Sequence, residues 1–450
     1  MKLRIATLAC LLFASHASAS GFDVARFGSD QAHAAAPTPY ATYYNPAALS
    51  LTRKGELALD VITAIRSASY DRTDTTVAEP RDGRGANLGK SSLTDVLVGP
   101  ALAASFRIGD LGIGLAAVAP FAGSAHWDGN NSFRGNEKYP GAQDGRARWH
   151  VISGTSQTIY LSAGAGYNFR KIGLSLGASA NLIYSTLDLT RATTLQLDDA
   201  LANEGRIHIK GSGWMGSFAV GAMWEILRNK LWLGVSYQAP PGMYDGMTLK
   251  GKVRTNFGTV SSVDADLHQT LPDFIRFALR FREPSYELRL SGDYARWSVF
   301  DNQCVSQRGA ACTINKDGSA SESVRETLIS SSARNWKDAL SLRLGGSYYF
   351  KGGWELLGSL GWDGNPVPDS MLEPTYPLGT DVNYQVGGRY RFGKRWALSI
   401  AYTGMYFLPR DTTGKSTLDT LMPPGNMPSA DGKYTQYISL FNTFAQVYFD

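Results

Sequence analysis

Once its first 19 residues are set aside, the 450-residue sequence has no apolar run long enough to form a membrane helix. Such a helix needs roughly 20 consecutive apolar residues. The longest later run, 111–122, is interrupted by two glycines and by Pro120. Charged residues make up only 18% of the chain, and the net charge is +5. This small positive excess gives no reason to expect a nucleic-acid partner.

Cysteine is also scarce, with three residues in the whole chain. Cys304 and Cys312 lie eight positions apart in a stretch with no nearby histidine or further cysteine, so we expect no metal site there. In an oxidising compartment these two thiols are expected to form one disulfide. No phosphate-binding loop is found, and we expect no cofactor. The pair therefore predicts a stiffened loop and no chemistry.

Residues 1–19 have the features of a secretory signal. A basic start and a short apolar stretch precede Ala17-Ser18-Ala19, which matches a signal-peptidase site. The mature chain is expected to begin at Ser20. We therefore divide the sequence into a signal peptide (1–19), an N-terminal segment that does not look like strand (20–54) and a strand-rich remainder (55–450).

Aromatic residues and glycine are abundant, at 11% of the chain and 48 residues respectively. An exported chain that is rich in both and poor in helical patterns has the composition of an outer-membrane barrel. A large secreted β-protein would have a similar composition. The choice between these two classes depends on the order of strands and loops.

Strict alternation of side-chain type predicts strands with two different faces, most clearly in 383–392. One face there is apolar and the other polar: Tyr384, Val386, Tyr390 and Phe392 against Asn383, Gln385, Arg389 and Arg391. A membrane barrel turns the polar face inward, whereas a soluble sandwich turns it outward. We expect the two arginines to line the polar wall of a lumen.

The candidate strands are 56–70, 95–108, 110–121, 154–170, 171–189, 206–227, 229–241, 246–257, 271–283, 284–298, 338–350, 353–363, 380–393, 394–408 and 435–449. Single-chain bacterial barrels have an even number of strands. We therefore merge the two segments that flank Pro240-Pro241-Gly242 into one long, kinked strand that projects beyond the membrane. The expected fold is all-β, an antiparallel transmembrane barrel of about 14 strands.

The connections alternate between long loops and short turns along the chain. The long loops are expected at 71–94, 122–153, 190–205, 258–270, 299–337, 364–379 and 409–434. Long loops at one end and short periplasmic turns at the other are the layout of an outer-membrane barrel. This alternation favours the barrel over a sandwich.

Several segments in this order resemble the FadL-type outer-membrane transporters of long-chain fatty acids, which include the TodX-like channels for aromatic hydrocarbons. The resemblance runs from about residue 20 to the end. The matching segments are Ser20-Gly21-Phe22, Asn45-Pro46-Ala47, Pro120-Phe121, Leu271-Pro272, Tyr294 to Trp297, Asn335 to Asp338 and Trp362 to Asp369. Pro120-Phe121 departs from the family pattern, with Ala122 where glycine is usual.

The resemblance implies that residues 20–54 form a hatch inside the barrel, and that a hydrophobic ligand passes through an interior pocket and a gap in the wall. It places Lys337 near the ligand, as the candidate partner of a carboxylate head. Ser20, Gly21 and Phe22 would reach the pocket, and Asn45, Pro46 and Ala47 would anchor the hatch. The alternative for Lys337 is a structural salt bridge with Asp338 or with an inward-facing acid, and the alternative for residues 20–54 is a tethered linker.

The expected function is passive uptake of long-chain fatty acids or similar hydrophobic molecules. We expect a monomer in contact with outer-membrane lipid and lipopolysaccharide. A lipid hydrolase and an adhesin or structural barrel are the alternatives, but neither needs a mobile plug. Gly173-Leu174-Ser175-Leu176-Gly177 fits a G-x-S-x-G pattern, yet it lies within an alternating strand and lacks the strand–turn–helix context of a nucleophile. We therefore expect no enzymatic activity.

Overall fold

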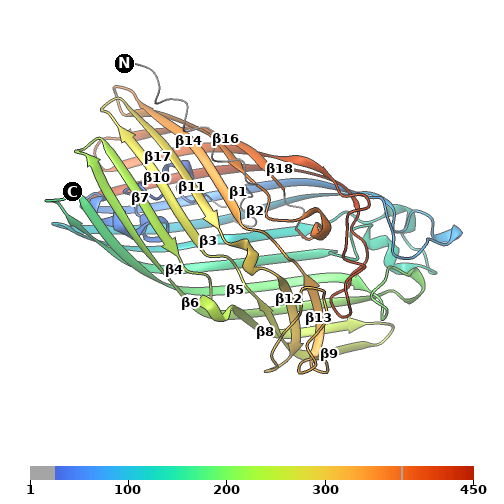
Figure 1. Cartoon of the computed structure of the whole chain (residues 1–450). Helices are drawn as coiled ribbons and strands as arrows, with labels where there is room; N and C mark the ends of the chain where they lie inside the picture. Colours follow the sequence, from blue (N-terminus) through green and yellow to red (C-terminus); the bar gives the residue numbers. More distant parts are fainter. Residues whose placement is uncertain (1–25, 377–378, 450) are drawn as a thin grey trace, which may run out of the picture.

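The structure is a computed structural model that describes residues 26–376 and 379–449 (Figure 1). The expected signal peptide and Ser20, Gly21 and Phe22 lie outside the described residues. Among the residues described, no helix is both long and apolar enough to span a membrane.

Eighteen strands form one antiparallel sheet that closes on itself where β1 pairs with β18. Their bounds are β1 Gly55–Arg72, β2 Gly89–Ile108, β3 Leu111–His126, β4 Ser153–Phe169, β5 Leu174–Thr193, β6 Gly205–Leu227, β7 Leu231–Gln238, β8 Met247–Asn256, β9 Val260–Gln269, β10 Phe274–Arg282, β11 Tyr286–Ala295, β12 Asn302–Gln307, β13 Leu328–Ala333, β14 Ala339–Tyr349, β15 Trp354–Asp363, β16 Asp381–Phe392, β17 Trp396–Asp411 and β18 Gly432–Phe449.

These strands occupy fourteen positions around the barrel, because four positions hold two strands in line. β7 and β8 both pair with β6, on either side of the break at Pro240 to Gly242. β10 pairs with β7 while β9 pairs with β8, and the next two positions are divided in the same way between β11 and β12 and between β14 and β13. The predicted barrel and the merged, kinked strand are confirmed.

Two segments expected as loops are partly strands. Residues 258–270 contain β9, and 299–337 contain both β12 and β13. Together with β8 these strands extend one side of the barrel beyond the level at which the other strands end (Figure 1). β12 and β13 lack an alternating apolar face, because they project past the lipid. β9 does alternate, but its apolar residues Ala265 and Leu267 point inward and are 3% and 4% exposed.

The polar faces of the strands point into the barrel and the apolar faces point out. In β16, Asn383 and Gln385 are 1% and 3% exposed, whereas Tyr384 and Val386 are 45% and 51% exposed. An apolar surface is stable on the outside of a barrel when lipid covers it. This arrangement selects the membrane barrel over the soluble sandwich.

Short turns join the strands at the end of the barrel that also carries the chain's C-terminus, and longer connections lie at the other end (Figure 1). By the usual rule the short turns are periplasmic. The few helices are short: η1 Ser29–Gln31, α1 Ala41–Tyr44, η2 Pro46–Leu51, η3 Arg81–Gly83, η4 Asn131–Phe133, η5 Pro140–Asp144, η6 Leu201–Asn203, η7 Met243–Asp245, η8 Trp297–Val299 and η9 Asp369–Met371.

Candidate functional site

Residues 26–54 lie inside the barrel near its periplasmic end and form the hatch (Figure 1). Most of its side chains are buried, and Tyr40, Tyr43 and Leu49 are no more than 1% exposed. η2 begins with Pro46 at its first turn, where a missing N–H costs nothing. The hatch is therefore a packed part of the barrel interior.

A row of glycines on the inner wall receives η2. Gly112, Gly166, Gly177 and Gly221 are register partners on the neighbouring strands β3, β4, β5 and β6. A β-carbon at any of these positions would collide with hatch atoms between Asn45 and Leu49. The hatch backbone thus lies across four strands in a groove that exists only because these positions have no side chains. We call this row of four residues the glycine seat.

The Asn45 side chain links this part of the hatch to the barrel wall and to other residues of the hatch. Its side-chain amide donates to the carbonyl oxygens of Ala34 at 2.6 Å and of Ala222 on β6 at 3.0 Å. Its side-chain oxygen accepts from the Ala47 N–H at 3.1 Å, which caps η2. Asn45 is fully buried. One amide therefore satisfies three backbone groups that water cannot reach.

Residues 26–33 meet the opposite wall through polar groups. The Gly28 N–H donates to Asp60 on β1 at 2.7 Å, and Gln31 donates to Glu355 on β15 at 3.0 Å. Arg26 lies 3.4 Å from the Asp363 carboxylate. The hatch is held sterically on one side and by polar contacts on the other.

The barrel wall has a window between β2 and β3. The two strands pair only from Leu102 opposite Ala117 to Ile108 opposite Leu111. Above this level Pro100 and Pro120 lie on the two rims, and proline cannot donate a hydrogen bond to a neighbouring strand. Contacts of the His126 and Asp128 N–H groups with β2, at 3.0 and 2.8 Å, close the window at the top.

An apolar cavity of about 60 Å³ connects the lumen with this window. It is lined by Phe27 of the hatch, by Ile62 and Leu440 of the wall, and by the rim residues Leu97 and Ala119. Leu97 lies on the face of β2 that points inward, yet it is 36% exposed, while Ala101 on the same face is fully buried. The exposure of Leu97 follows from the missing strand partner.

A second, mostly apolar cavity of about 80 Å³ lies further toward the extracellular end and shares Ala122 with the first. Leu187, Leu189 and Ile438 line it together with the cation Arg66. Arg66 donates to the Gln436 side-chain oxygen at 2.8 Å and to the Ser124 carbonyl at 2.7 Å. Within the described chain no carboxylate forms an ion pair with Arg66.

Residues 7–431 match the sequence model of a family described as outer membrane protein transport protein (OMPP1/FadL/TodX). The chain belongs to this family. Its members are outer-membrane transporters and channels for hydrophobic compounds, and this chain is accordingly an outer-membrane protein. The resemblance found in the sequence motifs is therefore confirmed.

Individual relatives are distant. A putative outer membrane protein of Neisseria meningitidis is 22% identical over 434 residues, which is 90% of either chain. The long-chain fatty acid transport protein of Escherichia coli is 21% identical over 215 residues, covering 42% of this chain and 44% of that one.

Solved structures share the fold at low identity. A Pseudomonas aeruginosa FadL homologue is 18% identical with a TM-score of 0.74, over 97% of this chain and 100% of that one. The Pseudomonas putida toluene transporter TodX is 16% identical with a TM-score of 0.59, over 91% and 93% of the two chains.

The two most specific FadL-type motifs, 335–338 and 362–369, lie side by side. The Lys337 N–H donates to the Pro366 carbonyl at 2.8 Å. The Lys337 side chain, however, is exposed and does not lie in a desolvated lumen. The alternative salt bridge is absent as well, since Asp338 accepts hydrogen bonds from Tyr294 at 2.5 Å and from the Ser298 N–H at 2.9 Å. Sequence reasoning missed Arg66, which shares the inward face of β1 with three other charged residues, Glu56, Asp60 and Arg72.

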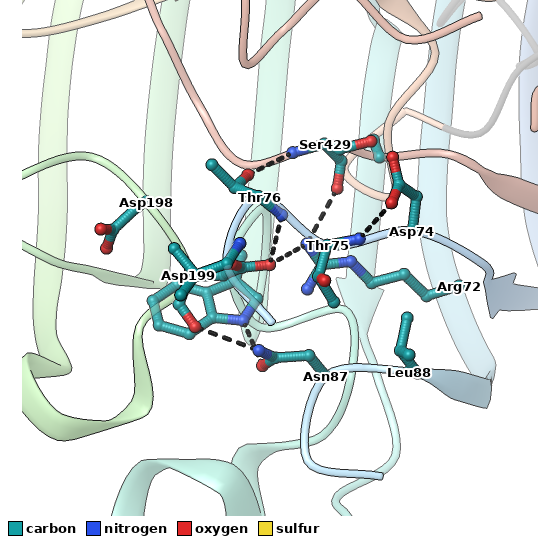
Figure 2. Close-up of polar contacts among 12 residues, drawn as sticks. Arg72, Asp74, Thr75, Thr76, Asn87, Leu88, Asp198, Asp199 and Ser429 are labelled. Atoms are coloured by element: carbon teal, nitrogen blue, oxygen red, sulfur yellow. Dashed lines mark hydrogen bonds and ion pairs between the residues drawn. The ribbon is translucent and has the colours of Figure 1, made fainter. Parts of the chain in front are cut away.

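The extracellular loops of this FadL-type barrel are tied together by buried polar groups. Asp199 accepts hydrogen bonds from Arg72 at 2.5 Å and from the Thr76 and Val77 N–H groups at 3.2 and 2.8 Å (Figure 2). Arg72 also donates to the Ser429 carbonyl at 3.0 Å. The side chains of Arg72 and Asp199 are both fully buried. These contacts join the loops 73–88, 194–204 and 412–431.

The loop 127–152 belongs to the same assembly, which we call the extracellular cap. Arg148 donates to Glu204 at 2.9 Å and to the Asn87 side-chain oxygen at 2.8 Å. His150 is buried, and its Nδ1 lies 3.5 Å from the Glu373 carboxylate. Burial lowers the pKa of His150 from 6.5 to about 4, although the Glu373 charge acts in the opposite direction. The cap is thus held by charged groups that have lost most of their water.

Two other sequence features have a structural place. Cys304 and Cys312 are joined by a disulfide with a Cα–Cα distance of 6.3 Å. Ser175, the central residue of the G-x-S-x-G pattern, lies in β5 with its hydroxyl 2.9 Å from that of Ser50 in the hatch. Gly177, which ends the pattern, belongs to the glycine seat, so this stretch receives the hatch.

Proposed function

We propose that this chain takes up long-chain fatty acids or similar hydrophobic molecules passively, through the interior apolar cavities and a lateral route gated by the hatch. The ligand would enter from the extracellular side, rest in the cavities and leave sideways through the window into the membrane. An apolar pocket with few polar groups suits a molecule with a long tail and a small head. The names of the E. coli and P. putida relatives fit this class of substrate.

The window between β2 and β3 carries the proposal. It joins a cavity lined by apolar side chains to an outer surface on which Val98 and Leu102 are 60% and 46% exposed. A hydrophobic molecule that leaves there never has to enter water. Phe27 of the hatch lies at the inner side of the same cavity, so a movement of residues 26–33 would change its size.

Arg66 supports a substrate with an anionic head. It is a cation in a mostly apolar cavity, and it donates to two neutral oxygens, those of the Gln436 side chain and the Ser124 carbonyl. A carboxylate would supply a charge-assisted, bidentate partner. We therefore expect Arg66 to hold the head group, the role that the family resemblance suggested for Lys337. The proposed contact of Ser20, Gly21 and Phe22 with the pocket stays a prediction.

Deleting Pro120 tests the lateral route. In the pairing of β3 with β4, Ala119 and Pro120 together stand opposite Ile159 alone, so the deletion removes the bulge and restores an N–H to the rim. We expect the window to close. Oleate uptake by cells that carry only this variant should fall at least about tenfold, because the ligand has lost its exit. The control is Pro241→Ala at the other break in the wall. Unchanged uptake by a correctly folded deletion variant would contradict the lateral route.

Replacing Arg66 by Gln tests the substrate. Uptake of oleate should fall on the order of tenfold, because a charge-assisted contact is lost, while uptake of toluene should not change. Equal loss of both would mean that Arg66 only shapes the cavity. Release of free fatty acid from lipid vesicles by the purified protein would instead support a hydrolase.

A further inference from the structure

A third cavity, of about 220 Å³, lies at the periplasmic base of the barrel, beneath the hatch. Gln31, Pro37 and Thr38 of the hatch form part of its lining. The lining also holds six arginines and three glutamates: Arg53 at the end of the hatch and, from the wall, Arg280, Arg282, Arg289, Arg389 and Arg391, with Glu56, Glu287 and Glu355. The cavity therefore has a formal excess of three positive charges.

The glutamates are already occupied by groups of the cavity itself. Glu287 accepts hydrogen bonds from Arg280 at 2.8 Å, from Arg289 at 3.1 Å and from Tyr349 at 3.2 Å. Glu355 accepts from Arg389 at 3.2 Å, and from Gln31 of the hatch. Glu56 accepts from the neutral side-chain amide of Gln446. Two of the three glutamates are therefore paired with arginines of the cavity.

Three arginines of the cavity are incompletely paired. Arg289 is 4% exposed, and its Nε–H has no acceptor. Arg53 and Arg391 are half-buried and form no ion pair with any carboxylate of the described chain, and the Arg53 guanidinium lies over the ring of Tyr448 at 3.9 Å. A buried donor without a partner is costly, and a shortage of anions in a desolvated cluster of cations is more so.

We propose that this cavity is a binding site for a small oxyanion, a carboxylate or a phosphate, that enters from the periplasm. The planar guanidinium groups of Arg53, Arg289 and Arg391 match the geometry of either anion. Gln31, Thr38 and Arg53 come from the hatch while Arg289 and Arg391 come from the wall, so a bound anion lies between hatch and barrel. The site is distinct from the apolar cavities and does not depend on the proposed uptake.

Calorimetric titration of the purified, full-length protein in neutral detergent tests the site. Sodium phosphate and sodium butyrate serve as probes, since both are soluble and butyrate is too short to fill the apolar cavities. We expect saturable binding of at least one of them. The double variant Arg53→Gln/Arg391→Gln should weaken it on the order of tenfold or more, because two charge-assisted contacts are lost.

The control is the double variant Lys394→Gln/Arg395→Gln. It removes the same charge from the adjoining periplasmic turn, where both side chains are exposed and outside the cavity. Binding of butyrate alone would identify a carboxylate site and binding of phosphate alone a phosphate site. No saturable binding of either probe, or an equal loss in both double variants, would overturn the proposal. If Arg53→Gln/Arg391→Gln fails to fold, anion binding by the single variant Arg391→Gln is compared with binding by Arg395→Gln.

Discussion

The two ends of the lumen are closed in different ways. At the periplasmic end the hatch backbone lies against the glycine seat, where contact requires the absence of side chains. At the extracellular end the cap is held by buried charged pairs such as Arg72 with Asp199 and Arg148 with Glu204. Close packing changes little with pH, whereas titratable groups respond to it. The comparison suggests that the hatch seat is sensitive to side-chain volume and the cap to charge.

The largest effect is expected for Asp199→Asn, which leaves the buried Arg72 without a counter-charge. Loss of one partner of a buried pair costs about 3–5 kcal/mol. The cap should open locally while the barrel persists, and limited proteolysis of whole cells should cut the loops 73–88 and 194–204. The control is Asp82→Asn, which breaks an exposed pair with Lys138. Resistance of the Asp199 variant to protease would contradict a cap held by charge.

Gly177→Val should break the hatch seat without touching the cap. Its side chain would overlap Pro46 and Ala47, and overpacking of this kind costs about 1–3 kcal/mol or more. We expect the barrel to fold and resist SDS, while ion conductance in planar bilayers rises because the hatch is displaced. Gly216→Val is the matched control, since a β-carbon there has open space. Closed channels in both variants would mean that the seat is not needed.

The barrel could be predicted from the sequence because each strand has lipid on one face and a polar lumen on the other. Apolar and polar residues therefore alternate along it. The same reasoning fails for β12 and β13, which project beyond the lipid. It fails for the glycine seat as well, because Gly112 and Gly221 are brought into one row only by the register of four strands. Abundant glycine was visible in the composition, but its partner in the hatch was not.

Arg66 and Lys337 show the corresponding limit for the site. Motif similarity singled out Lys337, whose side chain turned out to be exposed. The sequence did not single out Arg66, because four charged residues share the inward face of β1 and because its neighbours Ser124 and Gln436 come from strands far away in the sequence. Pairing of distant strands, and hence the residues that meet in a cavity, cannot be read from local patterns.

Replacing both Asn45 and Pro46 by Ala should loosen the hatch more gently than Gly177→Val. The change removes the side-chain contacts with Ala34 and Ala222 and a fixed φ, at about 1–3 kcal/mol together. The barrel should still resist SDS at room temperature, because its wall is closed by its own strand pairing. Oleate uptake should change while the protease resistance of the cap does not. If the double variant keeps both its uptake and its conductance at the wild-type level, residues 26–54 do not gate transport.

The smallest effect concerns pH, and it should separate the two ends most cleanly. His150 is buried in the cap with a pKa of about 4, set by burial and by the charges of Arg72 and Arg191, with Glu373 acting against them. Its pKa in the unfolded chain is about 6.5. Below pH 6.5 the unfolded state therefore binds a proton that the folded state does not, so stability contributed by the cap falls as the pH drops from 6.5 toward 4.

At pH 5.5 this loss amounts to about 1 kcal/mol, since each unit of separation between pH and the unfolded pKa corresponds to about 1.4 kcal/mol. Hydrogen exchange of the loop 127–152 should accelerate several-fold between pH 7 and 5.5, after correction for the intrinsic pH dependence, while exchange of hatch residues 41–49 stays constant. His150→Gln should abolish the acceleration because a neutral amide has no proton to gain. Two outcomes would contradict this difference between the cap and the hatch. One is an equal acceleration of hydrogen exchange in the hatch residues, and the other is an acceleration in the cap loop that persists in His150→Gln.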